Sequence, residues 1–249
     1  MHIKSDQEIK LMQEGGKLLA GVKNTLAECV SVGVSAWEIE EKARELIKKT
    51  GGEPSFMRVP GYHWATCINV NEGIVHGIPK KEVIFKKGDV VSVDVGLYYK
   101  GFHTDTSVSK GLGVDNTTKE FLLAGEKALD KAIGMAIPGN HVSDISRALQ
   151  STIEGAGYSP VRSLVGHGVG RELHEDPQIP CYVVGRSYRD EELLEGLVIA
   201  IEIMYAFGSY EIKLMPDKWT ISTQDGTISA LYEETVAVTK NGPLVLTRV

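Results

Sequence analysis

The chain has 249 residues, 42% of them hydrophobic and 24% charged, which is typical of a globular protein with a substantial core. Its net charge of −6 mixes both signs, so the composition indicates no nucleic-acid-binding face. We expect no signal peptide, and no stretch approaches the ~20 apolar residues that span a membrane. The cysteines (Cys29, Cys67 and Cys181) lack CxxC spacing, which favours reduced thiols and a cytoplasmic protein.

The first half of the chain carries two helix start signals. Ser5 and Ser35 each stand three residues before a glutamate, the spacing of a capping box, in which side chains at both positions bind the free backbone N–H groups. Both serines predict a helix start. The second helix should end at Gly51-Gly52, because glycine readily adopts the left-handed conformation that closes a helix.

The second half predicts two more helices. Thr117 stands three residues before a glutamate and should open a helix that runs to about Met135. Ser143 should cap the next helix, which should end near Gly155 or Gly157.

The two halves repeat one pattern of helix, glycine-containing link, helix, glycine stop and strands. Predicted strands at 87–94 and 195–202 each contain a Gly followed six residues later by a carboxylate. We interpret this as an internal duplication with halves of about 1–112 and 113–249 in a single catalytic domain, since no linker separates them. The expected fold class is α+β, with helices covering one face of a curved antiparallel sheet.

Two aspartates flank a predicted hairpin. Asp94 is the only charge in the strand-like run 90–98, and a turn at 99–100 would return the chain through Asp105. With that turn the two carboxylates would lie directly opposite, where like charges destabilise a hairpin by up to ~1 kcal/mol. A divalent cation between them would remove this penalty. The alternative is a shifted register with solvent-exposed aspartates.

Three glutamates lie in later apolar runs. Glu202 is the only charge in the run 198–207. As a buried carboxylate it would need a cation, a set of hydrogen bonds, a salt bridge or a raised pKa. Glu233 and Glu234 follow a hairpin turn predicted at 225–226. Adjacent strand residues face opposite sides, so only one of the two can face a site, and alternation does not decide which.

Three histidines are candidates for function. His167 and His174 share a glycine-dense loop at 166–177, in which alternate glycines allow close approach of the backbone to a ligand. His76 lies beside a glycine. A lone histidine is usually structural. For two histidines in one such loop, a functional role is about as common as a structural one. The remaining histidines are left unassigned: His2, His63, His103 and His141.

The combined pattern resembles a known family. Asp94, Asp105, His167, Glu202 and Glu233, in this order, resemble the metal ligands of the methionine aminopeptidase and prolidase superfamily. The segments 67–79, 94–107 and 167–175 resemble type I methionine aminopeptidases in particular, and the resemblance covers nearly the whole chain. It implies the pita-bread fold, which has such an internal duplication. It also implies a monomeric enzyme that removes the initiator methionine from nascent polypeptide N-termini, which it could meet at the ribosome.

The resemblance further implies two divalent metal ions. Oxygen donors with one imidazole suit Mn, Fe(II), Co or Zn. Asp105 and Glu233 would bridge the ions, so that Glu233 rather than its neighbour faces the site. Asp94 would be a further ligand of one ion, and His167 and Glu202 would be further ligands of the other.

The chemistry implied is hydrolysis of the peptide bond by a metal-bridging hydroxide. Glu202 would also be the general base, His174 would stabilise the tetrahedral intermediate, and His76 would contact the substrate or the departing amine. The flexible methionine side chain needs an apolar pocket. By position, the candidates to line it are Phe56, Val59, Tyr62, Cys67, Leu173 and Trp219.

Three positions depart from the family pattern. Ile203 stands where proline is usual, Leu173 where phenylalanine is usual, and Glu234 where histidine is usual. These changes bear on metal preference, pocket shape and rate. Two other functions stay open: an X-Pro peptidase that uses the same metals, and a binding protein on this fold that has lost catalysis. The retained ligand set counts against the second.

Overall fold

The computed structural model describes residues 1–185 and 190–249. Within these ranges the helices are α1 Asp6–Cys29, α2 Ala36–Thr50, α3 Asn116–Gly134 and α4 Val142–Gly155, with a short 3-10 turn at Phe56–Arg58. The strands are β1 Glu53–Pro54, β2 Thr66–Val70, β3 Gly73–Val75, β4 Val90–Tyr99, β5 Phe102–Gly111, β6 Ser159–Pro160, β7 Val165–Gly168, β8 Glu175–Pro180, β9 Val198–Ala206, β10 Ile212–Leu214, β11 Ile221–Thr223, β12 Ser229–Thr239 and β13 Gly242–Val245.

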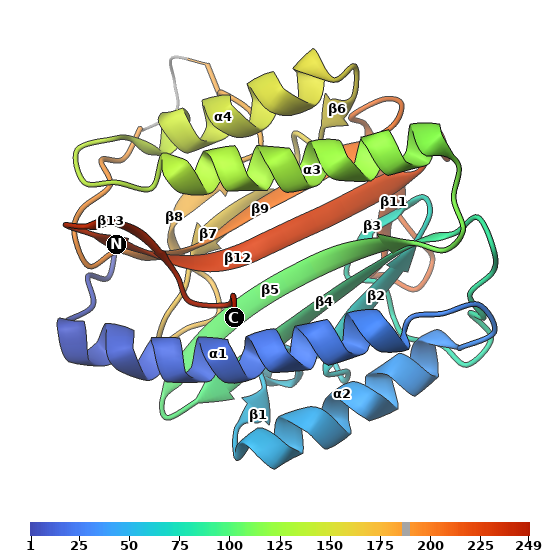
Figure 1. Cartoon of the computed structure of the whole chain (residues 1–249), viewed down its shortest axis with the longest axis horizontal. Helices are drawn as coiled ribbons and strands as arrows, with labels where there is room; N and C mark the ends of the chain where they lie inside the picture. The colour runs from blue at the N-terminus through green and yellow to red at the C-terminus, as the bar shows by residue number, and fades with distance from the viewer. Residues whose placement is uncertain (186–189) are drawn as a thin grey trace.

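The main sheet is antiparallel at each described pairing and runs β1-β4-β5-β12-β9-β7-β8, with β2, β6 and β13 joined at its sides. A second, three-stranded sheet has the order β10-β11-β3. In Figure 1, α1 and α2 lie along the half that contains β4 and β5, while α3 and α4 lie along the half that contains β9 and β12. The expected α+β class and helix-covered antiparallel sheet are confirmed.

The helix starts in the first half are as predicted. Ser5 and Ser35 each form a complete capping box with the glutamate three residues later. Gly51 ends α2 in the left-handed conformation, with φ of 78°. Local capping chemistry was therefore sufficient to locate both helix starts.

The predicted starts in the second half are wrong by two residues. Helix α3 begins after Asp115, whose carboxylate accepts the N–H of Thr118 at 2.8 Å. Helix α4 begins after His141, whose N–H donates to the carboxylate of Asp144 at 2.9 Å. Ser143 is not the cap, because its N–H and hydroxyl donate to Asp190 across a long stretch of sequence.

The aspartate hairpin has a register different from the predicted one. The turn lies at Lys100 and Gly101, with φ of 48° and 92°. This turn has both central residues in the left-handed region, which glycine favours. Asp94 therefore pairs with Ser107, two residues from Asp105 along the same strand. The aspartates are diagonal neighbours on one face rather than directly opposite.

The turn at 225–226 is also not the hairpin that was predicted. Strand β11 pairs with β10 and β3, and β12 pairs with β9, β5 and β13. The Asp225 carboxylate accepts the N–H groups of Ser209 and Thr227. It therefore stabilises a loop between the two sheets.

The repeated glycines occupy matching places. Gly88 and Gly196 have φ of 97° and 87°, and each lies two residues before its strand, β4 or β9. Both strands begin three residues later than expected. Each glycine also donates its N–H to a residue close to the end of the partner strand, Leu112 and Val238 respectively. These matches agree with the expected duplication, whose boundaries stay a prediction.

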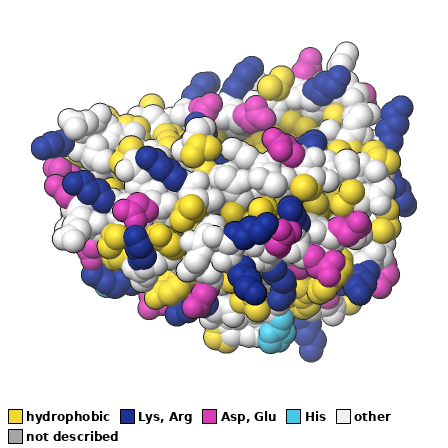
Figure 2. Space-filling view, turned by 60° about the horizontal axis from the view of Figure 1, so that its bottom comes forward, with side chains coloured by type: hydrophobic (Ala, Val, Ile, Leu, Met, Phe, Trp, Pro, Cys, Tyr) yellow, Lys and Arg dark blue, Asp and Glu magenta, His cyan; other side chains and the backbone are white. Residues whose placement is uncertain are grey.

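The core follows the two halves. One buried cluster packs α3 and α4 against β9 and β12, and another packs α1 and α2 against β4 and β2. Side chains of both signs are interspersed on the face that Figure 2 shows, as the composition predicts. Within residues 1–185 and 190–249, no helix is both long and apolar enough to cross a membrane.

Candidate metal centre

A cavity of about 700 Å³ opens on the face of the main sheet opposite α1. Its face follows from β12, because Glu234 points toward Lys23 of α1 and its neighbour Glu233 must point the other way. The cavity wall includes every predicted site residue: Tyr62, Cys67, His76, Asp94, Asp105, His167, His174, Glu202, Glu233 and Trp219.

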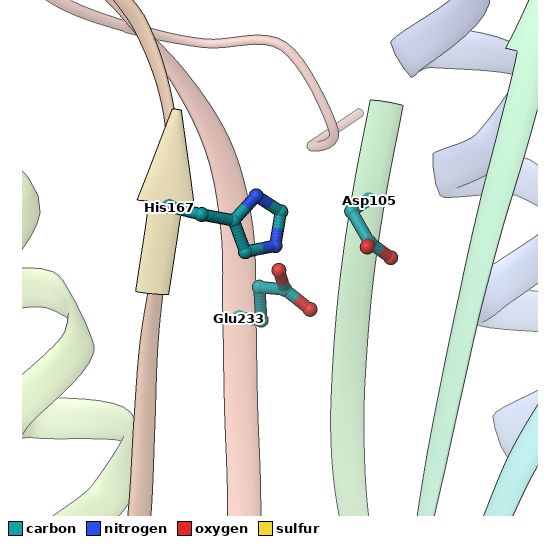
Figure 3. A group of neighbouring side chains, drawn as sticks. All are labelled: Asp105, His167 and Glu233. Carbon is teal, nitrogen blue, oxygen red and sulfur yellow. The ribbon is translucent and has the colours of Figure 1, made fainter. Parts of the chain in front are cut away.

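The centre of the cavity holds a tight cluster from three strands. Ligand-type atoms of Asp105, His167 and Glu233 all lie within 4.8 Å of one another. Figure 3 shows these side chains next to one another on β5, β7 and β12. Glu202 pairs directly with Glu233 in the β9–β12 register, and Asp94 is the diagonal neighbour of Asp105. Strand pairing alone thus places four carboxylates around one point.

Burial raises the pKa of all four carboxylic acids. The pKa of Asp105 rises to about 7, mainly because the group is buried. Burial is also the main cause for Asp94, Glu202 and Glu233, and neighbouring carboxylates add to it. No lysine or arginine of the described residues pairs with these four acids. Their charge therefore lacks compensation from the protein.

The hydrogen bond and burial of His167 would suit a neutral ligand. Its Nδ1–H donates to the Gly168 carbonyl at 2.9 Å, since a carbonyl can only accept. The lone pair of Nε2 is then available to the cavity. Burial lowers the pKa of His167 to about 4, so the imidazole is uncharged at neutral pH.

These residues fit a divalent cation. The Oδ1 atom of Asp94 is buried and has no hydrogen-bond partner among the described residues. A cation would satisfy this atom and offset the repulsion between the four carboxylates. Oxygen donors with one imidazole suit Mn, Fe(II), Co or Zn better than a metal that selects thiolates.

Two further histidines lie at the cavity wall. The rings of His174 and His167 meet edge to face with centroids 4.5 Å apart. Burial lowers the pKa of His174, and burial and His174 together lower that of His76. His76 has φ of 58°, an uncommon conformation for a residue other than glycine and one associated with functional sites. Gly77 beside it has no room for a side chain, because a Cβ would lie 2.2 Å from the Ile68 carbonyl.

The predicted apolar pocket forms one cluster beside the carboxylates. It consists of Phe56, Tyr62, Cys67 and Leu173, with Val59, Trp64 and Trp219 packed against it. The rings of Tyr62 and Trp219 meet edge to face at 5.1 Å. The Tyr62 hydroxyl donates to the Thr66 carbonyl at 2.8 Å. Burial is also the main reason why the pKa of the Cys67 thiol is raised, which favours an inert, apolar wall.

The glycines of the histidine loop allow neighbouring strands to pack closely, while their approach to a ligand stays a prediction. A Cβ on Gly166 would lie 2.6 Å from the Ala200 carbonyl, and one on Gly168 would lie 2.4 Å from the Asp176 carbonyl. These glycines therefore allow β7 to pack closely between β8 and β9. Their effect is to bring His167 within reach of the carboxylates.

Some residues of the cavity wall were not predicted. Met204 lies two residues after Glu202 on the same side of β9, and Gln178 pairs with His167 in the β7–β8 register. Period-two alternation from Glu202 could have found Met204. Gln178 could be found only from the pairing of β7 with β8, and the loop sequence carried no clear turn signal for that pairing.

The geometry agrees with the similarity to known proteins. Residues 10–240 match the model of metallopeptidase family M24, and the chain belongs to this family. It is 41% identical to a methionine aminopeptidase of Clostridium perfringens over 98% of each chain. The crystal structure of methionine aminopeptidase from Thermotoga maritima is 40% identical and superimposes over the full length of both chains with a TM-score of 0.96.

A prolidase from Pyrococcus furiosus shares the fold at lower similarity. It is 24% identical with a TM-score of 0.79, and the match covers 99% of this chain but 65% of the prolidase. These structures confirm the expected pita-bread fold.

Proposed function

We propose that this chain is a metal-dependent methionine aminopeptidase that hydrolyses the first peptide bond of nascent proteins and peptides. The observation that carries the proposal is one cavity with two parts. Uncompensated carboxylates and a neutral imidazole lie in one part, and a cluster of aromatic and aliphatic side chains lies in the other. The first part suits divalent cations and the second suits an unbranched apolar side chain.

The proposed ligands divide between two cations. Asp105 and Glu233 lie centrally and would contact both, Asp94 would hold one, and His167 with Glu202 would hold the other. When bound, the cations supply Lewis acidity and lower the pKa of water enough for attack near neutral pH. The metal is of the Mn, Fe(II), Co or Zn type.

The remaining steps belong to side chains at the cavity wall. Glu202 takes up the proton of the attacking water, a role that its raised pKa favours. His174 is neutral at pH 7 because burial lowers its pKa, and it donates a hydrogen bond to the scissile carbonyl as negative charge develops there. His76 contacts the substrate or the departing amine. Tyr62, Cys67 and Trp219 enclose the methionine side chain.

The setting of the enzyme is part of the same proposal. We expect a cytoplasmic monomer that meets its substrates, the N-termini of nascent polypeptides, at the ribosome. Sedimentation of the purified protein and its co-sedimentation with ribosomes would test these two points separately from the chemistry.

The direct test is methionine release from Met-Ala-Ser by chelator-stripped protein, with Mn²⁺ or Co²⁺ added back. Release that depends on the added metal is the expected result. An X-Pro peptide assayed in parallel is the matched control, and its preferential cleavage would contradict the methionine specificity. Absence of release with each divalent metal would contradict the enzymatic function and favour a binding protein on this fold.

A further inference from the structure

The join between the two halves of the sheet is short. Strands β5 and β12 pair through only two positions, Ser107 with Glu233 and Thr106 with Glu234. By contrast, the β4–β5 ladder runs continuously from Val90 to Tyr99. The two central carboxylates, Asp105 and Glu233, stand on opposite sides of this join, as Figure 3 shows. Their separation therefore depends on what holds β5 and β12 together.

Threonine side chains replace the missing backbone pairing. The hydroxyl of Thr235 accepts the N–H of Asp105 at 2.9 Å and donates to its carbonyl at 2.8 Å. The hydroxyl of Thr106 donates to the Glu233 carbonyl at 2.8 Å. Each hydroxyl thus binds the backbone of a central carboxylate on the other strand.

A buried ion pair supports these threonines on the α1 side. Lys23 of α1 donates to Glu234 at 2.8 Å and to the Thr106 hydroxyl at 2.9 Å. The side chains of Lys23 and Glu234 are only 9% and 6% exposed, so little water competes for these bonds. Near the end of the chain, the Thr247 hydroxyl donates to Glu234 and accepts the N–H of Thr235 at 3.0 Å.

Glu234 is one of the positions at which the chain departs from the family pattern. Here a second acid directly follows a central carboxylate, and Lys23 and Arg248 supply its counter-charge at 2.8 and 3.0 Å. Removing one partner of such a buried pair leaves the other uncompensated. The network is therefore a connected unit whose members depend on one another.

We propose that Thr106, Thr235, Glu234 and Lys23 form a polar lock that sets the spacing of Asp105 and Glu233 and thereby the affinity for divalent metal. These four are positioning residues, since none of them reaches the cavity that holds the metal ligands. The inference rests on the proposed function in one respect, that the carboxylate cluster binds divalent cations.

Matched substitutions of the two threonines test the lock. Thr106→Val and Thr235→Val remove the hydroxyl and keep the shape of the side chain. Thr106→Ser and Thr235→Ser keep the hydroxyl. The dissociation constant for Mn²⁺ is measured by competition with a chromophoric chelator, on protein shown to be folded by circular dichroism. We expect the valine variants to bind about tenfold more weakly and the serine variants to remain within about twofold of the parent.

Two controls separate the lock from general loosening. Leu149→Ala removes a buried side chain of α4 that lies outside the network, so it should lower thermal stability without changing the dissociation constant. Lys23→Met should weaken Mn²⁺ binding in the same direction as the valine variants. Valine variants that bind like the parent, or a Leu149→Ala variant that binds as weakly as they do, would overturn the lock.

The methionine-release assay distinguishes the two proposals. A parent protein that binds Mn²⁺ and releases no methionine contradicts the proposed function, while weakened binding in its valine variants still supports the lock. An active parent whose valine variants bind Mn²⁺ normally contradicts the lock alone.

Discussion

Glu233 and Glu234 are adjacent, both buried and directed to opposite faces of the same strand, yet their surroundings differ completely. Glu233 faces three other carboxylic acids, with no cation from the described residues beside it. Glu234 faces Lys23 and Arg248 and accepts a hydrogen bond from the Thr247 hydroxyl. Burial of an acid is therefore no sign of a metal site by itself. What marks the site is buried negative charge that the protein leaves without compensation.

The largest effect should come from the carboxylate with two proposed roles. Glu202→Gln keeps the shape but cannot take up a proton, so turnover should fall by roughly 10²- to 10⁴-fold. Methionine release from Met-Ala-Ser at saturating Mn²⁺ measures this, with circular dichroism as the check on folding. Near-normal turnover in this variant would remove Glu202 from the proposed mechanism.

The two neighbouring glutamates should respond with opposite signs in the metal-free protein. Glu233→Gln removes a repelled charge and should raise the free energy of unfolding by about 1 kcal/mol. Glu234→Gln leaves Lys23 without its carboxylate and should lower that free energy by about 3 kcal/mol. Urea unfolding with chelator present measures both. If both variants changed the free energy of unfolding in the same direction, the difference in charge compensation between Glu233 and Glu234 would be contradicted.

The next effect concerns Asp94, whose Oδ1 has no partner among the described residues. Asp94→Asn removes a charge from one proposed cation, so metal affinity should fall by about tenfold or more, with loss of one ion at limiting metal. Metal analysis after dialysis, compared with Ser107→Ala on the paired strand, measures the change. An unaltered metal content would count against Asp94 as a ligand.

The smallest effect is a pH dependence of the metal-free protein. The folded pKa of Asp105 is raised to about 7, so the folded state holds a proton that the unfolded state releases at lower pH. The stabilisation that this proton gives the folded state is present at low pH and is lost as pH rises through about 7. His167, with its pKa lowered to about 4, is neutral in the folded state throughout that range. The free energy of unfolding should therefore fall by about 0.8 kcal/mol in total between pH 6.5 and 8, with the slope levelling off above pH 7.5.

Added metal provides the control for this titration. Saturating Mn²⁺ should reverse the slope, because the cation binds the ionised carboxylates and competes with protons. Urea unfolding across the same pH range, with chelator or with metal, gives both curves. A metal-free protein whose free energy of unfolding is flat or rises between pH 6.5 and 8 would contradict the raised pKa of Asp105.

Local chemistry predicted two of the helix starts and failed at the other two. Ser5 and Ser35 cap their helices as predicted, whereas Asp115 caps in place of Thr117, and Ser143 bonds to Asp190 instead of capping. The predicted register of the aspartate hairpin was also wrong. Two turns are compatible with the sequence, and only the conformations of Lys100 and Gly101 select one of them.

The sequence alone predicted which residues carry the chemistry. Lone charges in apolar runs and paired histidines among glycines can be recognised without coordinates, because burying an uncompensated charge is costly wherever it occurs. Only the tertiary structure decided how those residues meet. The register of β5 against β4, the short join between β5 and β12, and the reach of Lys23 from α1 to Glu234 all depend on contacts between distant segments. No local pattern records such contacts, since each partner is equally satisfied by water until the chain folds.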